Sequence, residues 1–262
     1  MSIYKVIAIN HAAESENRIH SDEIASRFGF RGALVPGVAV YGYITHPLVE
    51  RFGADWLSSH QTSVRFLKPA YDGEELTIEM KPARDAAGDG WDVTCTSPFG
   101  ELLAVMKSKT PCTAPPEPAA PVFSRTPLER ERVLISADTI NLERPLPVWQ
   151  WRTEQASNVE YAAQVADDLP VYPQYVHPHW ALGTANYILV RSYIMPAWIH
   201  VGSEITQHRP FRANSTVDIA AACVEKWERK GHEFVKLDIR YTDADGLIAR
   251  VMHTAIYKVA GA

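Results

Sequence analysis

Three polar residues near the start of the chain have types and spacing that suit proton transfer to or from water. His20 carries an imidazole, which titrates near neutral pH and can act as a general base. Asn17 can orient a water molecule through its side-chain amide, and the Ser15 hydroxyl can position one. We therefore expect His20, Asn17 and Ser15 to form a catalytic group in which His20 is the base.

An internal repeat offers a structural interpretation of the same residues. When the chain is shifted by 141 residues it aligns with itself without a gap from Asn17 to Ile78, and a period this long indicates a duplicated small domain. In this register Asn17 falls on Asn158, whereas His20 falls on Tyr161. Because the asparagine is present in the copy that lacks the histidine, a turn or cap role for Asn17 stays open. A packed structural role for His20 stays open as well.

The repeat also divides the chain. Val105–Met106 matches Val251–Met252 at a shift of 146, so the second copy carries five extra residues. We expect one copy to span residues 1–110 and to carry the His20 motif, and the other to span residues 128–262 with a degenerate site. Prolines recur through residues 111–127 between them, which predicts an extended linker.

The elements that must position these residues follow the same order in both copies. Val38–Phe52 and Trp180–Ile194 are largely apolar around their circumference, which predicts two buried helices, and Pro47 could bend the first. Strand-like segments follow each helix: Ser63–Leu67, Glu75–Met80, Gly90–Ser97 and Glu101–Thr110, then Ser203–His208, Thr216–Lys226, Glu233–Tyr241 and Leu247–Val259. One helix followed by antiparallel strands, made twice, predicts an α+β fold in which a sheet wraps each central helix. The two sheets could join edge to edge and so cover exposed edges.

Composition excludes several classes of function. Hydrophobic residues make up 46% of the chain, the net charge is −5, and no run of Lys and Arg suggests a nucleic-acid partner. No secretion signal is visible and no apolar run reaches about 18 residues, so we expect a cytoplasmic protein without a membrane partner. The cysteines show no metal spacing, and His177-Pro178-His179 has no acidic or cysteine partner at a ligand spacing, so we expect no metal site.

The segment from Asn17 to Gly37 resembles the hydratase motif of the MaoC-like dehydratase family, also called the hydratase 2 family. The matching positions are Asn17, Ile19, His20, Ala25, Gly29, Phe30, Gly32, Val35 and Gly37. The later Phe66–Glu74 resembles the strand and turn of that family, and Val176–Pro178 and His208–Phe211 echo the same places in the second copy. The resemblance covers nearly the whole chain and implies a double hotdog fold.

The resemblance also implies a function. Hotdog proteins of this family act on acyl thioesters of coenzyme A or acyl carrier protein. The implied activity is that of a hydro-lyase of fatty acid metabolism, which hydrates an enoyl-CoA or enoyl-ACP reversibly or dehydrates the 3-hydroxyacyl form. A non-catalytic acyl-thioester-binding protein and a thioesterase are the alternatives. No cofactor is expected beyond the carrier of the acyl group, and the duplicated chain could act as a monomeric pseudo-dimer or as a homodimer.

The chain departs from the family pattern at informative places. Ser15 stands where the family has its catalytic aspartate, Arg18 replaces a proline, and Pro36 replaces the histidine before the last glycine. Double hotdog hydratases also usually carry the motif in their second half, whereas here it lies in the first. Because a serine cannot share the work of a base, position 15 discriminates a hydratase from a binding protein.

Further residues could complete a thioester site. Gly32 and Gly37 lie in the turn before the first buried helix, whose N–H groups could stabilise an oxyanion. Arg65 and Lys68 could contact the phosphates of coenzyme A, although solvated strand ends are the alternative. Tyr161, with the aromatic residues around it, could line an acyl tunnel, although core packing is the alternative.

Overall fold

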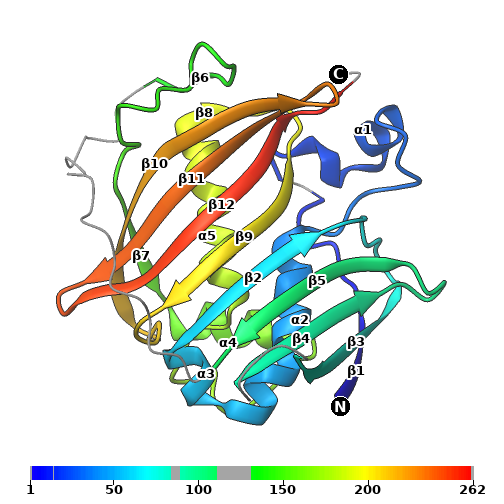
Figure 1. Cartoon of the computed structure of the whole chain (residues 1–262), viewed down its shortest axis with the longest axis vertical. Helices are drawn as coiled ribbons and strands as arrows, with labels where there is room; N and C mark the ends of the chain where they lie inside the picture. Colours follow the sequence, from blue (N-terminus) through cyan, green and yellow to red (C-terminus); the bar gives the residue numbers. More distant parts are fainter. Residues whose placement is uncertain (1, 14, 84–88, 111–130, 261–262) are drawn as a thin grey trace.

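The computed structural model describes residues 2–13, 15–83, 89–110 and 131–260. Within these residues the main feature is a ten-stranded sheet in the order β1-β3-β4-β5-β2-β9-β12-β11-β10-β7, with every neighbouring pair antiparallel (Figure 1). Its strands are β1 (Ser2–Ile7), β2 (His60–Phe66), β3 (Glu75–Pro82), β4 (Gly90–Thr96), β5 (Leu102–Lys109), β7 (Trp149–Thr153), β9 (Ile199–Gln207), β10 (Ser215–Arg229), β11 (His232–Asp243) and β12 (Gly246–Lys258). A separate parallel pair joins β6 (Val133–Leu134) to β8 (Tyr193–Ile194).

The strand order shows the duplication directly. From the centre outward, β2, β5, β4, β3 and β1 on one side match β9, β12, β11, β10 and β7 on the other. The central pair is β2 and β9, in which Ser63 pairs with Glu204, its own counterpart in the 141-residue register. A pseudo-two-fold axis therefore crosses the sheet at this pair, and the two half-sheets join edge to edge as expected.

Two long helices form the layer behind the sheet. These are α2 (Gly37–Phe52) and α5 (His179–Ser192). The described residues also form the shorter helices η1 (Arg18–His20), α1 (Asp22–Arg27), α3 (Ala54–Ser58) and α4 (Gln155–Gln164). Figure 1 shows α2 behind the half-sheet of the first copy and α5 behind that of the second. Every residue of α2 from Val38 to Val49 is buried, and Leu182, Ala185 and Leu189 of α5 are fully enclosed. The expected α+β architecture, with a central helix wrapped by antiparallel strands in each copy, is confirmed.

Prolines set the starts of both central helices. Pro36 and Pro178 each lie immediately before the first helical residue, where the fixed φ of proline suits the entry to a helix. The first helix begins at Gly37, one residue earlier than expected, and continues past the internal Pro47 to Phe52. The second ends at Ser192, two residues earlier than expected, because β8 begins at Tyr193.

Several elements lie outside the sequence expectations. The edge strands β1 and β7 and the short helix α3 were not expected. The pairing also corrects the second match of the repeat. Val64 pairs with Met106, while its counterpart Ile205 pairs with Val251, so Met106 and Val251 are equivalent and the second copy carries four extra residues at this point, not five. A slip of one residue reverses which side chains face the core, and neighbouring apolar residues hide such a slip in the sequence.

The described strands of the two copies are separated along the chain. Strands of the first copy end at Lys109, and the first strand of the second copy begins at Val133. The linker expected at residues 111–127 lies outside the described residues. In the part of the chain that the structure describes, no helix is both long and apolar enough to cross a membrane.

Candidate functional site

Two cavities meet between the repeats. The larger has a volume of about 650 Å³ and extends along α5, and the smaller has about 270 Å³ and lies beside the start of α2. The residues that line both are Asn17, His20, Pro36, Asn186 and Trp198. The first three belong to the first copy and the last two to the second, so the candidate site needs both copies.

A short loop fixes the ring of His20 at the junction of the two cavities. His20 ends η1, and its Nδ1 lies 2.7 Å from the carbonyl oxygen of Leu34. A carbonyl can only accept, so Nδ1 carries the proton and Nε2 carries the lone pair. Burial lowers the pKa of His20 below its usual value, although the Leu34 hydrogen bond opposes this. The imidazole is therefore neutral near pH 7, which is the form that a general base requires.

Asn17 connects this loop to the second repeat. Its side-chain Oδ1 accepts from the backbone N–H of Trp198 at 3.2 Å, and its Nδ2 donates to the carbonyl of the same residue at 3.0 Å. Nδ2 also lies 3.2 Å from Nε2 of His20. Asn158 ties together loops of its own copy, by accepting from His177 N–H and donating to the carbonyl of Tyr172. Both asparagines are thus structural, and Asn17 in addition contacts the candidate base.

Ser15 lines the larger cavity, and among the described residues its hydroxyl makes no hydrogen bond to His20. Its hydroxyl donates to the backbone carbonyl of Asn17 at 3.3 Å. The nearest acidic residue along this loop among the described residues is Glu16, whose carboxylate is paired with Arg132 at 2.8 Å. No carboxylate therefore assists His20 from position 15 or 16 in this arrangement.

The two turn glycines have different places. Gly37 is the first residue of α2 and lines the smaller cavity, while Val38 lines the larger. The first N–H groups of a helix have no acceptor within it, so the start of α2 offers donors to both cavities. Gly32 lines neither cavity and lies against the carboxylate of Asp22. The helix start, and not Gly32, is the candidate oxyanion site.

The three residues that we expected to contact the substrate lie in different surroundings in the structure. Lys68 lines the smaller cavity, where its ammonium pairs with Glu101 at 2.6 Å. Arg65 is exposed on β2 and lines neither cavity, because alternate residues of a strand face opposite sides of the sheet. Tyr161 is only 7% exposed and also lines neither; its ring stacks on His179 at 4.0 Å. Arg65 and Tyr161 therefore lie outside the lining of both cavities, and Lys68 lines one of them.

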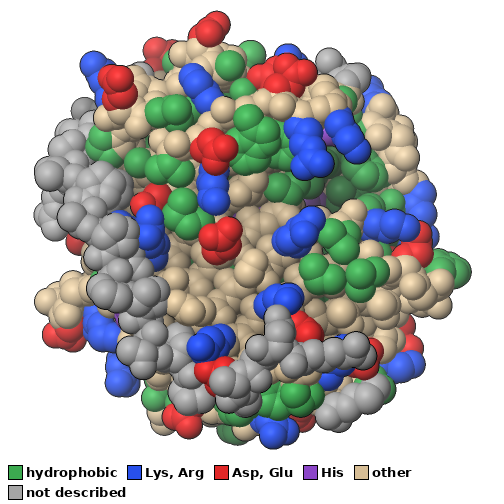
Figure 2. Space-filling model, viewed as in Figure 1, with side chains coloured by type: hydrophobic (Ala, Val, Ile, Leu, Met, Phe, Trp, Pro, Cys, Tyr) green, Lys and Arg blue, Asp and Glu red, His purple; other side chains and the backbone are tan. Residues whose placement is uncertain are grey.

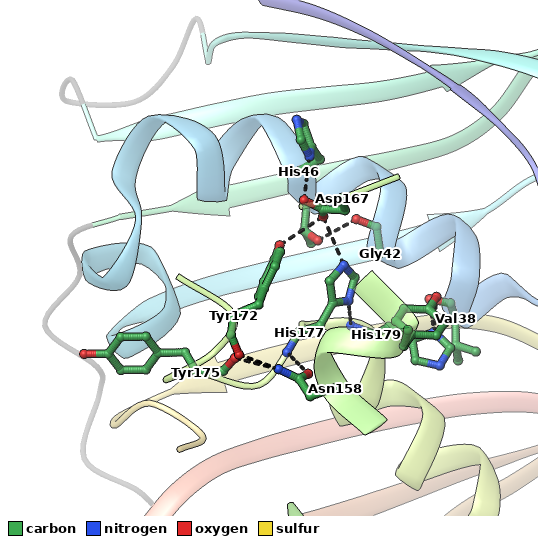
Figure 3. Close-up of polar contacts among 11 residues, drawn as sticks. Val38, Gly42, His46, Asn158, Asp167, Tyr172, Tyr175, His177 and His179 are labelled. Atoms are coloured by element: carbon green, nitrogen blue, oxygen red, sulfur yellow. Dashed lines mark hydrogen bonds and ion pairs between the residues drawn. The ribbon is translucent and has the colours of Figure 1, made fainter. Parts of the chain in front are cut away.

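Buried side chains fill the counterpart of the site in the second copy (Figure 3). Asp167 accepts at Oδ2 from the Tyr172 hydroxyl at 3.0 Å and contacts Nε2 of His177 at 3.0 Å. Its Oδ1 lies 2.9 Å from Nδ1 of His46, which belongs to α2 of the first copy. Hydrogen bonds with His177 and His46 hold the pKa of Asp167 well below its usual range, against the opposing effect of burial.

Equivalent glycines in the two central helices show how the two copies differ. Gly42 of α2 and Gly183 of α5 are equivalent in the 141-residue register. Gly183 lines the larger cavity, whereas a Cβ on Gly42 would lie only 3.0 Å from the ring of His177. The place along α2 that corresponds to the open cavity along α5 is therefore occupied by the protein itself.

Several residues that line the larger cavity belong to no sequence motif. Asn186, Arg191 and Trp198 line the larger cavity, and Asn186 Oδ1, Arg191 Nε and Trp198 Nε1 are buried without a hydrogen-bond partner among the described residues. Buried polar atoms are normally satisfied, so these three atoms are unusual among the polar groups of the residues that line the cavity. They come from the second copy, and only the fold brings them to His20. The described residues contain no group of three or more His, Cys, Asp or Glu that could hold a metal ion.

Comparison with known proteins identifies the fold. No protein-family model matches the chain, and no curated protein matches it in sequence. A candidate MaoC domain protein dehydratase from Chloroflexus aurantiacus aligns over 98% of this chain and 95% of its own, with 13% identity and a TM-score of 0.61. A conserved hypothetical protein from Mycobacterium tuberculosis, described as a double hotdog, aligns over 97% and 95%, with 13% identity and a TM-score of 0.65.

A third structure carries a different activity in its name. A candidate oleoyl thioesterase from Lactobacillus plantarum aligns over 98% of this chain and 97% of its own, with 10% identity and a TM-score of 0.56. All three similarities extend over the whole described architecture. The chain therefore has a double hotdog fold, and since this fold hosts both activities, the site must decide between them.

Proposed function

We propose that this protein binds an acyl thioester in the two joined cavities and hydrates an enoyl thioester reversibly, with His20 as the general base. The observation that carries the proposal is the placement of His20. His20, with Nε2 unprotonated, is a lining residue of both cavities, and Gly37 and Val38 at the start of α2 line one cavity each. A base and an oxyanion site in one enclosure are what this addition needs.

The proposed reaction balances on these groups. Nε2 of His20 takes a proton from water as the oxygen attacks the β-carbon of the enoyl group. The negative charge that develops on the thioester oxygen is stabilised by the N–H groups at the start of α2. The imidazolium then returns the proton to the α-carbon, which yields the 3-hydroxyacyl thioester. Dehydration follows the same steps in reverse.

The shape and polarity of the cavities support an acyl thioester as ligand. Their combined lining is partly apolar, with Val38, Val40, Val190 and Ile256 among the residues, and it carries the unpartnered polar atoms of Asn186 and Trp198. The resemblance of Asn17–Gly37 to the MaoC-like hydratase motif supports the same ligand class. Because the two cavities meet at His20, the acyl group would occupy one cavity and the carrier arm would occupy the other.

A thioesterase is the second candidate, and it is favoured over a conventional hydratase because no carboxylate among the described residues is bonded to His20. Hydrolysis needs water activated for attack on the carbonyl carbon, which a single base can supply, and it needs no proton at the α-carbon. The same cavities and the same helix start would serve that reaction.

One assay distinguishes the candidates. Purified protein is incubated with crotonyl-CoA while the enoyl absorbance and the release of free thiol are followed together. Hydration predicts loss of the enoyl absorbance without free thiol, and hydrolysis predicts release of thiol in step with turnover. Tight binding of crotonyl-CoA without either change would identify a binding protein and would contradict the proposed catalysis.

A further inference from the structure

A row of three buried polar side chains lies beneath the smaller cavity, on strands of the second copy. His200 and Ser203 belong to β9, and His253 belongs to β12. Nε2 of His200 lies 2.9 Å from the Ser203 hydroxyl, which lies 3.1 Å from Nδ1 of His253. All three side chains are at most 5% exposed. Nothing in the base chemistry assigned to His20 uses them.

A β-bulge creates this row. In a regular strand, residues three apart face opposite sides of the sheet, so His200 and Ser203 would point away from each other. The register between β9 and β12 shifts between Thr254 and Ala255, which pair with Gly202 and His200. One residue of β9 is thereby left over, and His200 and Ser203 come to the same inner face. Ser203 pairs directly with His253 across the strands.

One nitrogen of this row is buried beside the smaller cavity. Nδ1 of His200 is buried without a hydrogen bond among the described residues, and His200 lines the smaller cavity together with His20 and Gly37. A Cβ placed on Gly37 would lie 3.6 Å from that nitrogen and 3.4 Å from the ring of Phe66. The space above Gly37 is thus bordered by the start of α2 and by this ring nitrogen of His200.

The ring of His200 is held in one orientation and is uncharged. Phe66 packs edge-on against it with 4.8 Å between ring centroids, and Ser203 fixes the opposite nitrogen. Burial, together with the neighbouring His253, lowers the pKa of His200 well below its usual value, although an interaction with the Gly202 backbone opposes this shift. A neutral imidazole carries one proton, and when the Ser203 hydroxyl donates to Nε2 that proton lies on Nδ1.

We infer that His200 donates its Nδ1–H to the carbonyl oxygen of an acyl thioester seated above Gly37, as a second oxyanion donor beside the N–H groups at the start of α2. The identity of the ligand rests on the proposed function. A neutral imidazole next to a helix start can polarise a carbonyl without losing its proton, so no proton is transferred in this role. Ser203 and His253 are positioning residues that hold the donor tautomer.

The carbonyl stretch of bound butyryl-CoA, labelled with carbon-13 at the carbonyl, tests this directly. Butyryl-CoA has no double bond to hydrate, and a hydrogen bond to its carbonyl lowers the stretching frequency. We expect a clear downshift with the unaltered protein and loss of most of it in His200→Phe. His200→Gln retains an amide N–H and should keep part of the shift. The matched control is His60→Phe, since His60 is also a buried histidine but lines neither cavity.

Turnover supplies an independent readout. His200→Phe should lower kcat for crotonyl-CoA by about 10²–10³-fold with a smaller change in KM, because an oxyanion donor acts mainly in the transition state. An unchanged carbonyl frequency in His200→Phe, or no binding of butyryl-CoA by the unaltered protein, overturns the inference. If His200→Phe does not fold, Ser203→Ala takes its place: a reduced shift supports the inference, and a full shift overturns it.

The two proposals fail in different ways. A His200-dependent carbonyl shift without any hydration of crotonyl-CoA would refute the hydratase and keep the assignment of His200. Hydration with a carbonyl shift that does not depend on His200 would keep the hydratase and refute the assignment.

Discussion

The least usual residue of the site is Ser15. The MaoC-like motif that this loop resembles has an aspartate at this position, and here the Ser15 hydroxyl donates to the Asn17 carbonyl and not to His20. The neighbouring Glu16 is held by Arg132. Among the described residues, His20 therefore has a carbonyl and an amide as partners but no carboxylate, and we expect this to limit the rate of any proton transfer through it.

A carboxylate at position 15 should restore the missing group. We predict that Ser15→Asp raises kcat for hydration of crotonyl-CoA by about tenfold or more, because a second acid/base group contributes on the order of 10² or more when well placed. Ser15→Asn is the control of similar size without a charge, and it should give no gain. An equal effect of both variants would show that position 15 acts through packing and not through proton transfer.

Asp167 is the residue on which the filled counterpart site depends. We predict that Asp167→Ala lowers the free energy of unfolding by about 3 kcal/mol or more, because His46, His177 and Tyr172 would keep buried polar atoms without their partner. Urea unfolding measures this. Glu75→Ala, which breaks an exposed pair with Lys5, is the control and should change stability little. Similar losses in both variants would contradict a special role for the buried network.

Residue types and spacing singled out His20, Asn17 and Ser15, and the structure places all three in the lining of the larger cavity because they lie in one loop. Asn186, Trp198 and His200 could not be found in this way, since each is an isolated residue that only the fold brings to the cavities. Arg65 shows a different limit: its charge suggested a phosphate contact, but strand alternation turns it away from the cavity.

At the scale of the elements, hydrophobic periodicity was sufficient for the two central helices and for eight strands of the sheet. The edge strands β1 and β7 escaped, because an edge strand is half exposed and has a weaker apolar pattern. The bulge in β9 also left no sign in the sequence, although it places His200 beside Ser203. Register, and not the existence of strands, was the harder quantity to predict.

The seam between β2 and β9 depends on one glycine. A Cβ on Gly202 would lie only 2.7 Å from the carbonyl oxygen of Val64, which belongs to the backbone and cannot move aside easily. We predict that Gly202→Ala lowers stability by about 1–3 kcal/mol, as overpacking typically does. Gly183→Ala is the control, since its nearest neighbour would be His179 at 3.6 Å and helix propensity favours alanine. Equal stability of Gly202→Ala and the unaltered protein would contradict this description of the seam.

At the scale of the whole molecule, duplication has produced one open site and one filled site. Figure 2 shows Lys, Arg, Asp and Glu side chains mixed across the outer face of the sheet, without one sign of charge dominating it. The specific chemistry lies on the other side of the sheet, between the two central helices and the loop that carries His20. The sequence showed the repeat and the replacement of the histidine by Tyr161 in the second copy. It did not show which residues fill the second site, because Asp167 and His46 belong to no motif.

Buried neutral histidines should make the molecule sensitive to acid. Burial lowers the pKa values of His60, His179 and His253 to about 3. In the unfolded chain these groups bind a proton near pH 6.5, so their neutral burial costs nothing above that pH and increasingly destabilises the fold as pH falls toward 3. The lowered pKa of Asp167 adds stability above about pH 3.8 that is lost below it.

We therefore predict that the free energy of unfolding falls by several kcal/mol between pH 7.5 and pH 5, measured by urea unfolding at each pH. His60→Gln removes one of the titrating groups and should reduce this pH dependence, even if it lowers stability at pH 7.5. A free energy of unfolding that stays constant from pH 7.5 to pH 5 would contradict the buried, neutral state of these histidines.

The central claim is that His20 acts as the base between the two repeats, and the hydration rate of crotonyl-CoA by His20→Ala tests it most directly. The variant should bind butyryl-CoA nearly as well as the unaltered protein but lose about 10²–10⁴-fold in kcat, the usual contribution of a general base. In the unaltered protein, kcat/KM should rise with pH through the lowered pKa of His20, below 6.5, and then stay level. Undiminished hydration by His20→Ala, with normal binding of butyryl-CoA, would contradict the account.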